Sequence, residues 1–362
     1  MTRSSWLFSR KTDLLFLFLP VWLVWVWAFS SNIQEQTLPL WAWVIFILGI
    51  DVSHVWSTIF RTYLSKNDRT IHRAKLIFTP CLLLPFLTTF SYINIKIYWS
   101  ILAYVAVYHF IKQQYGFMAL YSFKNKEQNS PKKRLFDKIV IYIGMLYPII
   151  FWHFDESRLF NWFAEDDFLP LHQVVQDINI FSYLNIIYFA ILLAWILNEV
   201  SISRKKDLAL GKIIWVTTTY FNWFLGIVYF NSDFVFSVTN VVAHGIPYLV
   251  LILKYKVEEQ HLLSNKKIPK PEVILHVFSI FSVILLLAFS EEYLWDMLIN
   301  LEKQEFFESF SPYWANVQNS PFLIALFTAI LTLPQATHYV LDGFIWKFGQ
   351  TNPNLKKIIA NE

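Results

Sequence analysis

The chain has 362 residues, of which 56% are hydrophobic, 19% aromatic and only 15% charged. Soluble domains average about 25% charged residues, so the composition excludes an ordinary soluble protein and indicates an integral membrane protein. The net charge of +4 is unremarkable, and the single cysteine, Cys81, excludes an internal disulfide and any cysteine-based metal site.

Ten apolar runs are candidates for membrane spans, because a membrane helix needs about 20 mostly apolar residues. In chain order they are residues 13–31, 38–60, 76–94, 97–121, 139–154, 178–198, 213–231, 234–254, 273–290 and 321–346. We therefore predict an all-α helical bundle of about ten transmembrane helices. Residues 1–362 are expected to form a single multi-pass domain in the cell membrane.

The distribution of positive charge predicts the orientation of the bundle. With the N-terminus inside, 26 of the 30 Lys and Arg residues fall in cytoplasmic segments, three fall in external segments, and Lys112 lies within a span. Such a bias follows the positive-inside rule and places both termini in the cytoplasm. Since topology accounts for the basic loops, nucleic acid is not an expected partner.

Four of the nine histidines lie well inside predicted spans. They are His54, His109, His244 and His338, on the second, fourth, eighth and tenth runs. Under the predicted topology all four spans run from outside to inside. At 1.5 Å of rise per residue, the four side chains share a layer about two helical turns thick. Ionisable groups at this depth are costly and mark function.

Each of these histidines has a polar neighbour three or four residues away, on the same helix face. The pairs are Asp51 with His54, Gln113 with His109, Asn240 with His244, and Asp342 with His338. A metal-bound imidazole usually donates its second N–H to a carboxylate or carbonyl group. The four histidines are thus predicted metal ligands and the four neighbours their partners, although either aspartate could itself be a ligand.

Three charged residues are candidates for a catalytic role. Asp51 and Asp342 could orient the histidines or join them at the metal. Lys112, next to Gln113 and three residues after His109, could offset a carboxylate or bind an anionic substrate head group.

Nitrogen and oxygen ligands without thiolate suit iron, zinc or copper. Non-haem iron is favoured, because histidine and mixed histidine–carboxylate sites commonly activate oxygen. Paired axial histidines on one helix would indicate haem, but no predicted span carries two histidines. There is no His-Glu-x-x-His zinc-protease motif, and no His-x-x-x-His motif of membrane desaturases. A proton or ion pathway, or plain helix–helix hydrogen bonding, would use the same residues.

The segments Asp51-Val-Ser-His54, Tyr108-His109-Phe110 and Asn240-Val-Val-Ala-His244 resemble the bacterial β-carotene-cleaving dioxygenases of the Brp/Blh-like kind. The resemblance covers roughly residues 41–254. It implies a multi-span membrane protein with an iron site built from histidines on several helices. In that family the later helix carries two histidines four residues apart. Asn240 takes the place of the first, and His338 could supply the missing ligand.

These observations together predict a metal-dependent membrane enzyme, a non-haem iron oxygenase acting on an isoprenoid or lipid-like substrate that enters from the bilayer. An electron-transfer partner is a further expectation. The alternative is a proton- or ion-coupled membrane transporter that uses the same His and Asp residues. A third interpretation is a structural membrane protein without chemistry.

Overall fold

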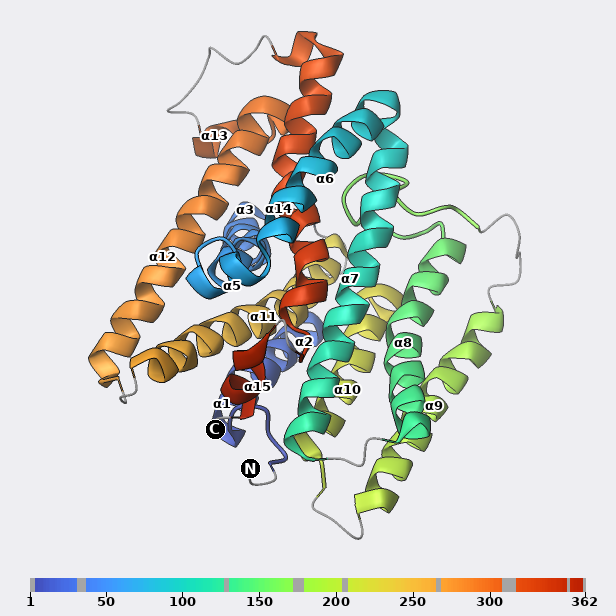
Figure 1. The fold of residues 1–362 in the computed structure, drawn as a ribbon. Helices are drawn as coiled ribbons and strands as arrows, with labels where there is room; N and C mark the ends of the chain where they lie inside the picture. The colour runs from blue at the N-terminus through green and yellow to red at the C-terminus, as the bar shows by residue number, and fades with distance from the viewer. Residues whose placement is uncertain are drawn as a thin grey trace. The chain divides into compact units, whose positions relative to one another are not determined.

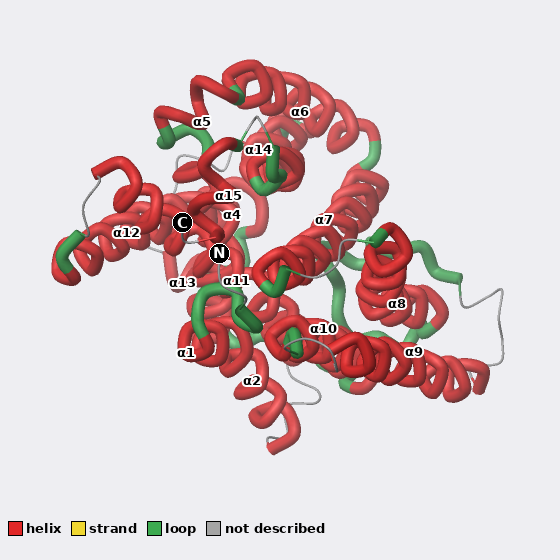
Figure 2. Tube along the Cα trace, turned by 60° about the horizontal axis from the view of Figure 1, so that its bottom comes forward, coloured by secondary structure: helices red, strands yellow, loops and turns green. Residues whose placement is uncertain are grey.

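The computed structural model describes residues 4–30, 37–126, 130–171, 179–203, 208–264, 268–307, 317–349 and 352–360. Within these ranges every regular element is helical (Figure 2), which confirms the all-α prediction. Several of the long helices contain π-helical or 3-10 segments, labelled η below. Such segments in a long helix often accompany functional sites or strain.

The chain divides into two compact units. The first unit comprises Met1–Ala42, Ala106–Pro247 and Glu362, and the second comprises Trp43–Val105 and Tyr248–Asn361. Two long helices, α7 (Ile95–Lys124) and α11 (Asp233–Ser264), continue from one unit into the other. The expectation of a single domain stays a prediction.

Besides its parts of α7 and α11, the first unit contains α1 (Arg10–Thr12), η1 (Asp13–Phe18), α2 (Leu19–Ser30), α3 (Leu40–Ala42), α8 (Pro131–Phe154), α9 (Asn179–Ser203), α10 (Leu210–Trp223) and η4 (Phe224–Tyr229). Among these, α8 packs against α9 and α10 (Figure 1). The N-terminal segment of this unit is anchored by the buried carboxylate of Asp13, which accepts hydrogen bonds from the backbone of Leu7 and Phe8 and from Tyr121.

The second unit contains η2 (Trp43–Val52), α4 (Ser53–Ser57), η3 (Thr58–Arg61), α5 (Lys66–Ile71), α6 (Arg73–Ile93), α12 (Lys270–Trp295), η5 (Asp296–Asn300), α13 (Gln304–Phe307), η7 (Val317–Asn319), α14 (Pro321–Ile345) and α15 (Pro353–Ala360). Here α14 packs along α6, and α12 packs against η2 and α4. An apolar cluster of Leu249, Ile280 and Ile284 holds α11 and α12 together and packs against Trp56 of α4.

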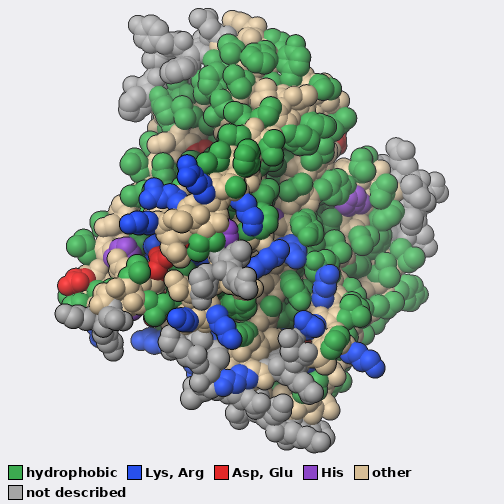
Figure 3. All heavy atoms as spheres, viewed as in Figure 1, with side chains coloured by type: hydrophobic (Ala, Val, Ile, Leu, Met, Phe, Trp, Pro, Cys, Tyr) green, Lys and Arg blue, Asp and Glu red, His purple; other side chains and the backbone are tan. Residues whose placement is uncertain are grey.

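Among the described residues, eight helices are long and apolar enough to cross a membrane: Arg10–Ser30, Leu40–Arg61, Arg73–Ile93, Pro131–Phe154, Ile180–Ser203, Asp233–Ser264, Lys270–Asn300 and Pro321–Ile345. They indicate a multi-pass membrane protein. Apolar side chains also predominate on the face drawn in Figure 3. The expected spans 97–121 and 213–231 are helical as well, in α7 and in α10 with η4, but fall outside these eight. Ten spans, cytoplasmic termini and the cell membrane as location stay predictions.

Candidate metal centre

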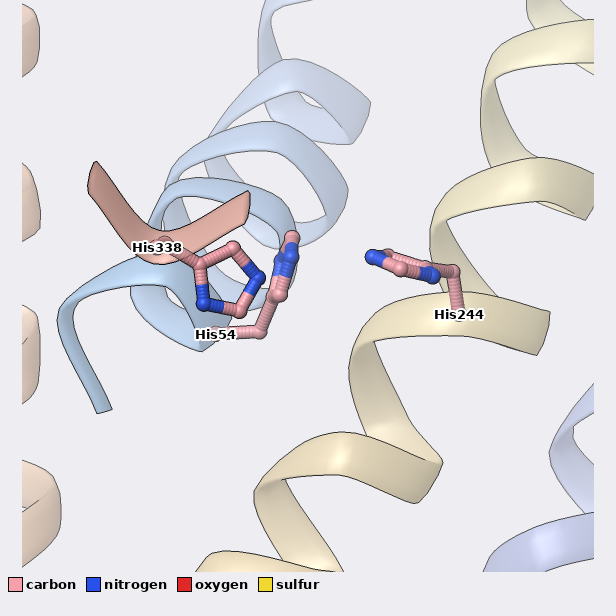
Figure 4. A group of neighbouring side chains, drawn as sticks. All are labelled: His54, His244 and His338. Atoms are coloured by element: carbon pink, nitrogen blue, oxygen red, sulfur yellow. The ribbon is translucent and has the colours of Figure 1, made fainter. Parts of the chain in front are cut away.

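The second unit holds a pair of buried histidines, His54 on α4 and His338 on α14, which are 2% and 1% exposed. Their ring centroids lie 5.2 Å apart with an interplanar angle of 77° (Figure 4). The two helices pack directly against each other. Two residues that lie 284 positions apart in the sequence are therefore neighbours.

His54 lies just after a π-helical stretch. The hydroxyl of Ser53 donates to the backbone oxygen of Leu48, five residues earlier, at 2.9 Å. One turn before His54, Asp51 places its Oδ1 atom 3.4 Å from Nδ1 of the imidazole. The predicted pairing of Asp51 with His54 is thus present in the geometry, and the Asp51 side chain is 31% exposed.

The pairing of Asp342 with His338 is less direct than the sequence pattern indicated. Oδ1 of Asp342 lies 3.6 Å from Nδ1 of His338, beyond hydrogen-bonding distance. The imidazole Nδ1 instead lies 2.6 Å from Oγ1 of Thr58. The carboxylate accepts a hydrogen bond of 2.6 Å from the phenol of Tyr248.

Sequence reasoning missed both Thr58 and Tyr248. A signal was nevertheless present, because Thr58 follows His54 by four residues and Tyr248 follows His244 by four residues. The spacing that singled out Asp342 beside His338 would have found them, had hydroxyl groups been included with carboxylates and amides.

The first unit holds a second pair of buried histidines, His109 on α7 and His244 on α11, which are 5% and 1% exposed. Their ring centroids are also 5.2 Å apart at an interplanar angle of 77°. The ring of Phe110 stacks on His244 with 3.6 Å between centroids. Phe110 in turn contacts Trp162, from the segment between α8 and α9. One face of the His244 ring is therefore covered by Phe110, with Trp162 behind it.

The two predicted amide partners both donate hydrogen bonds to the backbone of α11. Nε2 of Gln113 lies 2.8 Å from the backbone oxygen of His244, and Nδ2 of Asn240 lies 2.8 Å from the backbone oxygen of Phe236. Lys112 is exposed on α7, where its ammonium lies 5.9 Å from the ring centroid of Tyr115. The functional roles predicted for these three residues stay predictions.

Two glutamates of α12 lie close to α4, the helix that carries His54. Glu291 accepts a hydrogen bond of 2.6 Å from the indole of Trp56, and both Glu291 and Glu292 interact electrostatically with Asp51. The span expected from the sequence ended at residue 290 and so did not include them. The helix in fact continues to Trp295. Two consecutive glutamates directly after an apolar run are the feature of the sequence that could have pointed to them.

Among the described residues, His54, His338 and Asp342 of the second unit and His109 and His244 of the first belong to groups of side chains that could hold a metal ion. Imidazole and carboxylate donors fit iron, zinc or copper, and the single cysteine is exposed on α6. The geometry therefore supports a metal site without identifying the metal. No family model, no curated protein and no solved structure matches the chain.

Proposed function

We propose that the chain is an integral membrane metalloenzyme, a non-haem iron oxygenase that acts on an isoprenoid or lipid-like substrate. The observation that carries the proposal is the pair His54 and His338. Each Nδ1 atom already faces a protein oxygen, with Asp51 Oδ1 at 3.4 Å in one case and Thr58 Oγ1 at 2.6 Å in the other. In known sites a hydrogen bond at Nδ1, such as that between His338 and Thr58, directs Nε2 toward the metal.

The remaining ligands in this proposal are His244 and His109. His244 lies one turn before Tyr248 on the unbroken helix α11, and Tyr248 contacts the rings of both His54 and His338. Residues four apart on a helix share a face, which supports a ligand role for His244. His109 is a further proposed ligand, because its ring lies next to that of His244.

Iron bound by histidine and carboxylate ligands with an open position supplies oxygen activation. The protein residues would hold the imidazoles in position and keep water away. Phe110, backed by Trp162, would cover one face of the His244 ring, and Asp51 and Asp342 would orient or join the ligands. A substrate of the β-carotene kind, as the resemblance to Brp/Blh-like proteins implies, would enter from the bilayer. In this proposal Lys112 contacts a polar end of the substrate, and a redox partner supplies the electrons.

Elemental analysis of detergent-purified protein tests the proposal. Wild type is compared with His54→Ala and His338→Ala, and with His276→Ala as the matched control. His276 also lies in a candidate span, but its Nδ1 atom contacts Gln260 at 3.0 Å. We expect iron in wild type and in the control, and its loss in the other two variants.

Zinc or copper in place of iron would contradict the assignment as an iron oxygenase, but the metal site itself would stand. If all four proteins fold, as judged by gel filtration and circular dichroism, and none holds metal, the proposal fails. Oxygen consumption with carotenoid substrates is the activity assay that follows a positive result.

A second candidate is a proton- or ion-coupled transporter. Glu291 and Glu292 favour it, because they extend the acidic groups of the second unit beyond Asp51, and ionisable chains within membranes mark ion pathways. In proteoliposomes, a transporter should lose cation or proton flux on Asp51→Asn or Glu292→Gln. Glu272→Gln, an exposed site in the first turn of α12, should leave flux unchanged. Absence of flux in wild type would reject this candidate.

A further inference from the structure

We infer that Thr58 and Tyr248 are positioning residues for His338, because their hydroxyl groups form a hydrogen-bonded chain that fixes one tautomer of its imidazole. This inference rests on the proposed function, since it concerns how one metal ligand is prepared. It assigns a role to two residues of the second unit that carry no charge and bind no metal themselves.

The chain of hydrogen bonds runs from the imidazole to a carboxylate. Nδ1 of His338 lies 2.6 Å from Oγ1 of Thr58, which lies 2.9 Å from the phenol oxygen of Tyr248. That phenol donates to Oδ1 of Asp342 at 2.6 Å. The hydrogen bonds thus connect four side chains from η3, α11 and α14, and all four belong to the second unit.

The direction of each proton follows from the end of the chain. The phenol of Tyr248 donates its single proton to Oδ1 of Asp342. Its oxygen then accepts the proton of Thr58, and the oxygen of Thr58 is left to accept from Nδ1–H of His338. The lone pair of the neutral imidazole therefore lies on Nε2, the atom that would bind a metal.

Packing holds the ring in the orientation that this tautomer needs. The ring of Tyr248 meets His338 edge to face, with 5.1 Å between centroids and an interplanar angle of 89°. The ring of His54 also packs edge to face against the ring of His338. Thr58 is itself buried, so the acceptor for Nδ1–H lies in the packed interior of the second unit.

Outer partners of metal-bound histidines typically change metal affinity by about 10–100-fold when they are removed. Thr58→Val keeps the shape of the side chain but removes the acceptor, so we expect a loss of affinity in that range. Thr58→Ser retains a hydroxyl and should bind metal as wild type does. Tyr248→Phe keeps the ring contact with His338 but removes the group that orients the Thr58 proton, and should also weaken binding.

The experiment is a titration of metal-stripped, full-length protein in detergent with Co²⁺, followed by its visible d–d absorption. This spectrum reports the number and type of ligands, so it responds to a displaced histidine and not to a uniform loss of stability. Thr62→Val is the matched control. It removes a buried hydroxyl from the same segment, but that hydroxyl contacts the backbone of Thr58 and not His338.

Weakened Co²⁺ binding with an altered spectrum in Thr58→Val and Tyr248→Phe, rescue in Thr58→Ser and no change in Thr62→Val would support the inference. Wild-type affinity and spectrum in Thr58→Val overturn it while the metal site stands. Should Thr58→Val not fold, Tyr248→Phe decides the question in the same way. If wild-type protein binds no Co²⁺, the proposed metal site itself fails.

Discussion

The side-chain amide of Gln114 donates a hydrogen bond to the backbone oxygen of Ala243, with 3.2 Å between Nε2 and O. In a regular helix this oxygen would accept from the residue four positions later, which is Pro247 and has no N–H. Gln113 donates to the next oxygen along, that of His244. Adjacent glutamines of α7 thus satisfy backbone oxygens near the proline, where a membrane offers no water to do so.

Gln114→Leu should leave the oxygen of Ala243 without a donor and lower the free energy of unfolding by about 1–3 kcal/mol. In a Pro247→Ala background the new N–H can take over, so the same substitution should cost less. A double-mutant cycle in detergent measures this coupling. The hydrogen bond from Thr219 to Gln114 is lost in both backgrounds and cancels. Additive effects would contradict the prediction.

Removal of metal should lower the thermal unfolding midpoint of the wild-type protein. A ligand that binds only the folded state stabilises it by about 2.7 kcal/mol at 100 times its dissociation constant. Treatment with a chelator should therefore destabilise wild type, and re-addition of the metal should reverse the change. His54→Ala should show no such shift. An identical response of both proteins would mean that the chelator acts elsewhere.

Asp68→Ala should destabilise the second unit strongly. Arg61 is buried, and its NH1 atom lies 2.8 and 2.7 Å from the two carboxylate oxygens of Asp68. The guanidinium also lies 3.9 Å from the ring of Tyr255. Loss of one partner of a buried ion pair typically costs about 3–5 kcal/mol. Glu272→Ala, which removes an exposed carboxylate of α12, is the control and should change the unfolding midpoint little.

A comparable test applies to the first unit, where the fully buried ammonium of Lys212 lies 2.8 Å from Oδ2 of Asp137. The other carboxylate oxygen accepts from the indole of Trp195 at 2.9 Å. Lys212→Met should cost about 3–5 kcal/mol of unfolding free energy. Combined with Asp137→Leu it should cost less than the sum of the two single changes, as measured by chemical unfolding. A sum that is strictly additive would show that the pair is not coupled.

The sequence by itself determined the properties that depend on neighbouring residues. Hydropathy over a window of about 20 residues identifies a span wherever it lies, and all eight candidate spans of the structure correspond to predicted runs. Helical periodicity likewise placed Asp51 on the face of His54, because residues three apart in a helix are neighbours in any fold. The burial of the four histidines follows from the same local reasoning.

Only the tertiary structure decided which helices meet. It paired His54 with His338 and His109 with His244, and it divided the chain into two units that no composition change marks. It also gave Asp342 a tyrosine partner from α11 and brought Glu291 of α12 to Trp56. These contacts join residues far apart in the chain, and their choice depends on how whole helix surfaces fit together, which a single sequence read by local pattern does not specify.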